Sequence, residues 1–123
     1  MLFNSMLYYG GIGDSVKSIN VLDPSGTPVT QATTTLGPAG ATPVISANGT
    51  SKAIVWALDT TANGGPVLHA YDATDLSSEL YNSGTQAARD AVGPTSQYSV
   101  PVVANGHVYI GTQTGVNVYA LLP

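Results

Sequence analysis

One short segment of this chain occurs twice, and this repeat limits the possible folds more than any other feature. Residues 42–49 read TPVISANG and residues 100–106 read VPVVANG, so that Pro43 and Pro101 lie 58 residues apart. Each copy is followed by a run of apolar residues, a turn and a second apolar run. A recurring unit of this kind indicates a repeat architecture, in which each copy packs against its neighbours.

The apolar residues fall in short runs rich in Val, Ile and Tyr, bounded by Gly, Asn, Asp or Pro, which is typical of β-strands. Asn48-Gly49 and Asn105-Gly106 are hairpin signals, because Asn and Gly tolerate the positive φ of tight turns. Helical periodicity is confined to one turn at Gln86–Val92. The expected strands are Met6–Gly10, Lys17–Leu22, Pro28–Thr34, Pro43–Ala47, Ala53–Leu58, Val67–Tyr71, Ser78–Tyr81, Val100–Ala104, His107–Thr112 and Val116–Leu121.

The opening of the chain fits the same scheme. Residues 7–10 read LYYG and correspond to VYIG at 108–111, and a turn and a further strand follow them. We therefore expect one domain over residues 1–123 that contains three copies of one antiparallel meander. The expected copies are 1–38 with three strands, 39–99 with four strands and a long loop over 82–99, and 100–123 with three strands.

The repeat resembles a known family. Residues 108–120, VYIGTQTGVNVYA, are similar to the pyrroloquinoline-quinone-type β-propeller repeat, which reads VYVGT, a polar residue, Gly and a hydrophobic strand ending in YALD. Residues 68–81, LHAYDATDLSSELY, resemble the second half of that repeat. More narrowly, RD at 89–90, GP at 93–94 and PVVANG at 101–106 resemble the C-terminal part of secreted bacterial propeller proteins.

This resemblance covers residues 6–121 and implies an all-β, partial propeller of about two and a half four-stranded blades. It also implies an extracellular or periplasmic location, although Met1–Tyr9 lacks the basic n-region of a signal peptide. Propellers close with about four to eight blades. We therefore expect either the C-terminal part of a longer protein or a chain that must associate.

Composition excludes several classes of function. The formal net charge is −4 and there are three Lys and Arg residues, so we expect no nucleic-acid binding, which needs clustered cations. Cysteine is absent, which excludes disulfides and thiolate chemistry. No apolar run approaches the ~18 residues of a membrane helix, and we expect no membrane span.

Quinone-dependent dehydrogenases of the resembled superfamily hold their cofactor over a Trp, with a calcium ion and an Asp base, and many have paired cysteines. This chain departs from that pattern, because it lacks Cys and has no carboxylate cluster at a recognisable spacing. Trp56, its one Trp, lies in an apolar strand, where packing between sheets is the expected role. We expect no enzymatic activity, no cofactor and no metal site.

The remaining candidates are single residues. His69 and His107 lie on separate expected strands and are interpreted as polar strand positions rather than ligands. In the loop over 82–99, Arg89 is expected to pair with a carboxylate and pin the loop, which makes Arg89, Asp90 and Tyr98 a possible interaction site. Structural roles are expected for Trp56 and the turn residues Asn48, Gly49, Asn105 and Gly106, for tyrosines between sheets, and for Asp23 and Asp72 as acceptors within turns.

The sequence thus favours a non-catalytic propeller segment that acts as a scaffold or protein-interaction surface. Two alternatives remain open: a remnant of a quinone-dependent dehydrogenase with its cofactor residues upstream, and a carbohydrate-binding module that uses exposed Tyr. We also expect self-association or a protein partner at open sheet edges. The segments Leu2–Gly10 and Val116–Leu121 are apolar, β-prone and free of Lys, Glu and Pro, the residues that discourage edge pairing.

Overall fold

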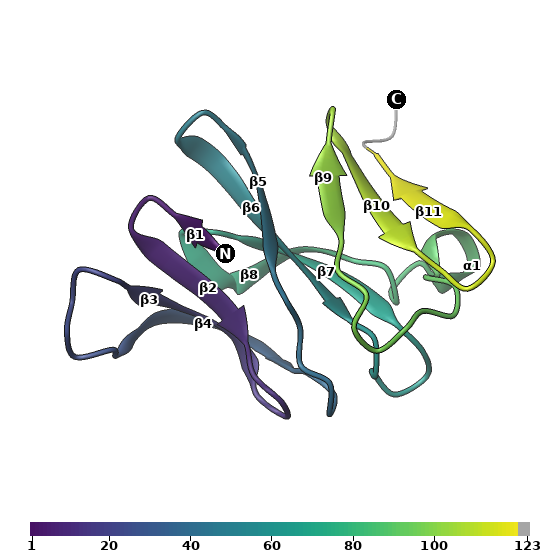
Figure 1. Ribbon diagram of the computed structural model, residues 1–123, viewed down its shortest axis with the longest axis horizontal. Helices are drawn as coiled ribbons and strands as arrows, with labels where there is room; N and C mark the ends of the chain where they lie inside the picture. Colours follow the sequence, from purple (N-terminus) through teal and green to yellow (C-terminus); the bar gives the residue numbers. More distant parts are fainter. Residues whose placement is uncertain (121–123) are drawn as a thin grey trace.

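The computed structural model describes residues 1–120, and its strands form three antiparallel sheets (Figure 1). Sheet 1 contains β1 (Leu2–Phe3), β2 (Met6–Gly10), β3 (Ser15–Asn20) and β4 (Pro28–Thr35). Sheet 2 contains β5 (Val44–Asn48), β6 (Ser51–Asp59), β7 (Val67–Asp72) and β8 (Asp75–Asn82). Sheet 3 contains β9 (Val102–Ala104), β10 (His107–Gly111) and β11 (Val116–Tyr119), and one short helix, α1 (Ala87–Asp90), precedes it. Within each sheet the strands pair in sequence order, which confirms the all-β class and the repeated meander.

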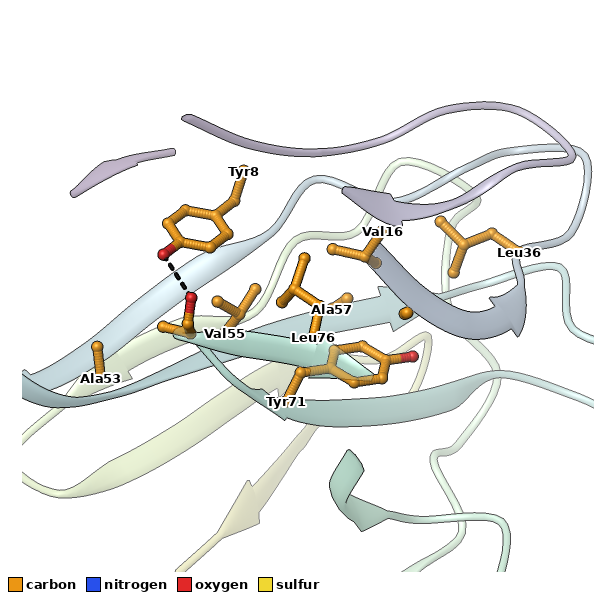
Figure 2. Close-up of a cluster of buried hydrophobic side chains, with 10 residues drawn as sticks. Tyr8, Val16, Leu36, Ala53, Val55, Ala57, Tyr71 and Leu76 are labelled. Atoms are coloured by element: carbon orange, nitrogen blue, oxygen red, sulfur yellow. Dashed lines mark hydrogen bonds between the residues drawn. The ribbon is translucent and has the colours of Figure 1, made fainter. Parts of the chain in front are cut away.

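The three sheets pack face to face, with sheet 2 in the middle (Figure 1). Figure 2 shows Tyr8 and Val16 of sheet 1 facing Val55 of sheet 2 in the first apolar cluster. A second cluster lies between sheets 2 and 3 and includes Leu58 and Ile110. Each such fully buried aliphatic side chain stabilises the fold by about 1.5–3 kcal/mol.

Sheet 1 contains a strand that sequence reasoning missed. Leu2–Phe3 pairs with the start of β2, so sheet 1 has four strands and the expectation of three in the first copy is wrong. Leu2–Gly10 is consequently a hairpin rather than one edge strand. Its turn residues Asn4 and Ser5 have φ of 49° and 61°, a left-handed conformation, and the turn lacks the Gly that marks the expected hairpins.

The expected strand Met6–Gly10 has the same bounds as β2, and the other expected strands are present with bounds shifted by one to three residues. The largest shifts are in β3, which begins at Ser15 and ends at Asn20, and in β8, which begins at Asp75. At the C-terminal end, β11 runs to Tyr119, and Leu121 of the expected strand lies outside the described residues. The hairpin at Asn105-Gly106 is confirmed, with φ of 50° and 75°.

The strand registers show that the sheets repeat residue by residue. In sheet 2, Val44 is paired with Trp56, and in sheet 3, Val102 is paired in the same way with Tyr109. In sheet 1, Tyr8 stands three residues after a two-residue turn, as Tyr109 does in sheet 3. Tyr8, Trp56 and Tyr109 therefore occupy one equivalent position on the second strand of each sheet.

The linkers between sheets also repeat, which the sequence comparison did not detect. Leu36-Gly37-Pro38 connects sheet 1 to sheet 2, and Val92-Gly93-Pro94 connects sheet 2 to sheet 3. Leu36 is buried in the first cluster and Val92 in the second. Each linker thus inserts one apolar side chain between the sheets that it joins.

Four tyrosines contribute to these contacts, as expected. Tyr8 and Tyr71 belong to the first cluster, whereas Tyr81 and Tyr119 pack against the second. The Tyr8 hydroxyl donates a hydrogen bond of 2.8 Å to the carbonyl oxygen of Ala73 in the next sheet. In all four tyrosines, burial is the main cause that raises the phenol pKa above its usual value.

These raised pKa values predict alkaline destabilisation. Above about pH 10 the unfolded chain loses its phenol protons first, so the stability present below that pH falls as pH rises toward the folded-state values. Urea unfolding followed by Trp56 fluorescence at several pH values measures this slope. The Tyr8→Phe variant should show a shallower decline, and an unchanged slope would contradict the assignment.

Candidate functional site

The two outermost sheets each have one face that no other described sheet covers. We call the free side of sheet 1 face A, and it carries Leu2, Leu7, Tyr9 and Ile19. Tyr8 points into the first cluster, so Leu7 and Tyr9 on either side of it point away. Leu7 is paired with both Leu2 and Ile19, which aligns three aliphatic side chains across β1, β2 and β3.

We call the free side of sheet 3 face B, and it carries Val102, Tyr109, Val116 and Val118. Tyr109 is paired with Val102 on one side and Val118 on the other, so an apolar row crosses all three strands. Val116 and Val118 are 62% and 53% exposed. Their neighbour Tyr119 points the other way and packs against the second cluster.

The residues of face B correspond in strand register to residues of sheet 2 that are buried. Tyr109 pairs with Val118 as Trp56 pairs with Ala70 in sheet 2, and two positions earlier on the third strand Val116 corresponds to Leu68. Leu68 belongs to the second cluster, against sheet 3, and is 0% exposed, and Ala70, on the same side of β7, is 1% exposed. The same two positions in sheet 1, Val16 and Ser18, are fully buried beneath sheet 2.

The residues of face A correspond in the same way to buried residues on the opposite sides of sheets 2 and 3. Tyr9 comes directly after Tyr8, so its counterparts are the residues after Trp56 and Tyr109, namely Ala57 in sheet 2 and Ile110 in sheet 3. Both counterparts are completely buried against the preceding sheet, whereas Tyr9 is exposed. Faces A and B are therefore the two halves of an interface that the chain already forms twice internally.

The expected interaction loop is held in place by Asp90 rather than by Arg89. The Asp90 carboxylate accepts hydrogen bonds of 2.5 and 2.6 Å from Arg89 and of 2.9 Å from the Tyr81 hydroxyl, and its backbone oxygen accepts one of 3.0 Å from Tyr119. The hydrogen bonds from Arg89 are the main cause that lowers the Asp90 pKa. Arg89 forms the expected ion pair with a carboxylate, that of its neighbour Asp90, and the hydrogen bonds that join the loop to sheets 2 and 3 are made by Asp90.

Tyr98 is at the other end of this loop and does not share in the hydrogen bonds around Asp90. It is the most exposed of the large hydrophobic residues among residues 1–120, at 78%. It lines a cavity of about 190 Å³ together with Gln97 and with Gly40 and Ala41 of the first linker. The structure therefore separates Tyr98 from Arg89 and Asp90.

His69 lies beside a second cavity, of about 440 Å³, between the first linker and sheet 2. Its ring is buried, stacks on Tyr71 with ring centroids 5.8 Å apart, and places Nδ1 2.6 Å from Glu79 Oε1. Asn82 also donates to that Glu79 oxygen, over 3.2 Å. Asp59 in the same wall accepts its hydrogen bonds from neighbouring backbone and hydroxyl groups. The polar groups are largely satisfied by one another, as in a structural junction.

The other predicted polar residues have local roles. His107 Nδ1 lies 2.8 Å from the backbone oxygen of Asn105, within the turn that precedes β10. Asp23 and Asp72 accept backbone N–H bonds from Ser25 and Thr74, as expected, and hydrogen bonding to these partners lowers both carboxyl pKa values. Among residues 1–120, no three His, Cys, Asp or Glu side chains are grouped as metal ligands would be.

Trp56 packs against the second cluster, as expected from its strand. Its Nε1 donates a hydrogen bond of 2.9 Å to Ser46 Oγ, and its ring centroid lies 6.5 Å from that of Tyr81.

No helix within residues 1–120 is long and apolar enough to cross a membrane. No family model, no curated protein and no solved structure matches this chain.

Proposed function

We propose that this chain is a non-catalytic, propeller-type scaffold segment that binds other protein through its outer sheets. The observation that carries the proposal is the exposure of Val116 and Val118 at register positions that are buried in both other sheets. Contiguous exposed apolar patches mark interaction sites in soluble proteins. The open strand edge of β11 is continuous with face B and adds unpaired backbone groups to the same surface.

The propeller-type assignment is supported by the stacking of successive meanders in one register and by the resemblance of residues 108–120 to the quinone-type repeat. On the same resemblance we propose an extracellular or periplasmic location. Trp56 argues against the alternative of a quinone-dependent dehydrogenase, since its ring is occupied by contacts with Tyr81 and Ser46. The carbohydrate-binding alternative would rest on the exposed ring of Tyr98.

Hydrophobic-interaction chromatography tests the proposal, with the chain loaded at a concentration where sedimentation shows monomers. The Val116→Asp/Val118→Asp variant should elute much earlier than the wild type, because two charges interrupt the continuous apolar face. Both side chains are exposed, so the circular dichroism spectrum should be retained.

The matched control is Ile12→Asp/Leu22→Asp, which makes the same charge change at two more exposed apolar residues in turns. Its elution should change far less, since these residues are isolated. Equal shifts for the two variants would show that added charge alone explains the result. Reduction of a dye after incubation with calcium and pyrroloquinoline quinone would also overturn a non-catalytic role.

A further inference from the structure

We infer that the partner of faces A and B is a second copy of this chain, stacked head to tail so that face A of one copy covers face B of the other. This inference rests on the proposed function and names its partner. Inside the chain, a side of type B is covered by a side of type A at both sheet junctions. A second copy supplies both missing halves at once.

One hydrogen bond makes the inference specific. In the first junction, the Tyr8 hydroxyl donates to the carbonyl oxygen of Ala73 in the next sheet, as Figure 2 shows. Tyr109 occupies the Tyr8 position on face B. In a head-to-tail pair, its hydroxyl would meet the residue of sheet 1 that corresponds to Ala73.

That residue is Val21. The amide of Ala73 donates 3.1 Å to the oxygen of Ala53, and the amide of Val21 donates 2.9 Å to the oxygen of Ser5, at the same place in their sheets. Val21 follows β3 as Ala73 follows β7, and it is half exposed. The Tyr109 hydroxyl of one copy should therefore donate to the Val21 carbonyl oxygen of the other.

Stoichiometry follows from the number of sheets. Two copies bring six sheets, which lies within the roughly four to eight that close a propeller ring. The contact is heterologous, because two different faces meet, and heterologous contacts end in rings or in open fibres. A closed pair has two A–B contacts and leaves neither face free.

Sedimentation equilibrium of the intact chain tests the inference. The wild type should be a dimer of the 12.5 kDa chain at micromolar concentration. Tyr9→Asp, which blocks face A, and Val118→Asp, which blocks face B, should each be monomeric. Leu2→Asp and Val102→Asp serve as second variants of each face, in case a first variant does not fold. Ile12→Asp, at an exposed residue in the turn between β2 and β3, should remain dimeric.

Mixing the two blocked variants decides the geometry. A face-A variant and a face-B variant still offer one intact A–B contact, so the mixture should form a dimer that is about 10²–10⁴-fold weaker than the wild type. Tyr109→Phe removes two hydrogen bonds from a closed dimer, one at each A–B contact, so it should weaken the wild-type dimer about tenfold to hundredfold, whereas Tyr98→Phe should not.

Three results would overturn the inference. A wild type that stays monomeric would exclude the second copy, while earlier elution of the face-B variant would still support an interaction face. A Tyr9→Asp variant that dimerises like the wild type would show that face B pairs with itself. Blocked variants that all remain dimeric would show that strand edges, rather than faces, make the contact.

Discussion

Replacement of Gly37 by alanine should lower the free energy of unfolding by about 2–3 kcal/mol, the usual cost of forcing extra atoms into a packed region. A Cβ at this position would lie 2.5 Å from the backbone oxygen of Thr61 and 2.5 Å from its hydroxyl oxygen. The backbone of sheet 2 would have to move away from the first linker. Because Leu36 is adjacent, the shift would also loosen the first apolar cluster. Urea denaturation followed by Trp56 fluorescence measures the loss.

Gly93→Ala is the matched control, since Gly93 holds the equivalent place in the second linker. A Cβ at Gly93 would lie 3.4 Å from its nearest neighbour, the Thr112 Cγ2 atom. This contact is with a side chain, which can move slightly to make room. We expect the free energy of unfolding to change by no more than about 1 kcal/mol, because alanine also lowers the conformational entropy of the unfolded chain, which favours the folded state. Equal losses in the two variants would show that the close approach of Gly37 to Thr61 does not determine the cost of adding a Cβ.

Much of this architecture could be predicted from the sequence because local signals and tertiary packing agree. Residues 53–58 alternate in side-chain direction, so their two sets of apolar residues fill two different clusters. The missed strand β1 has two residues and a turn of Asn4 and Ser5, which carries no Gly signal. Propensity cannot identify a pairing that depends mainly on the neighbouring strand β2.

The candidate interaction faces were harder to predict, for a physical reason. Alternation shows that Val116 and Val118 share one side of β11, but it does not show which side a neighbouring sheet covers. That depends on how each linker returns the chain across the previous sheet. The linker repeat was obscured because Val92-Gly93-Pro94 shares only Gly-Pro with Leu36-Gly37-Pro38 and follows an inserted helical turn.

Asp59→Ala should cost about 3 kcal/mol, because it leaves buried donors without an acceptor. Asp59 is almost completely buried. One carboxylate oxygen accepts the Gly37 amide at 2.8 Å, and the other accepts the Thr61 amide at 3.0 Å and the Thr61 hydroxyl at 3.3 Å. The side chain therefore joins the end of β6 to the linker from sheet 1. Chemical denaturation measures the loss of stability.

Asp72→Ala separates this effect from the loss of a turn. Asp72 makes the same local contacts as Asp59, since one oxygen accepts the amide of Thr74 at 2.8 Å and its hydroxyl at 2.6 Å, but these groups are exposed. Water replaces the lost acceptor there, so the expected cost is about 0.5–1 kcal/mol. If the two substitutions cost the same, the bond from Gly37 to Asp59 would contribute nothing beyond a turn. A markedly larger loss at Asp59 would show that this carboxylate fastens sheet 1 to sheet 2, because Asp59 alone of the two reaches across the junction.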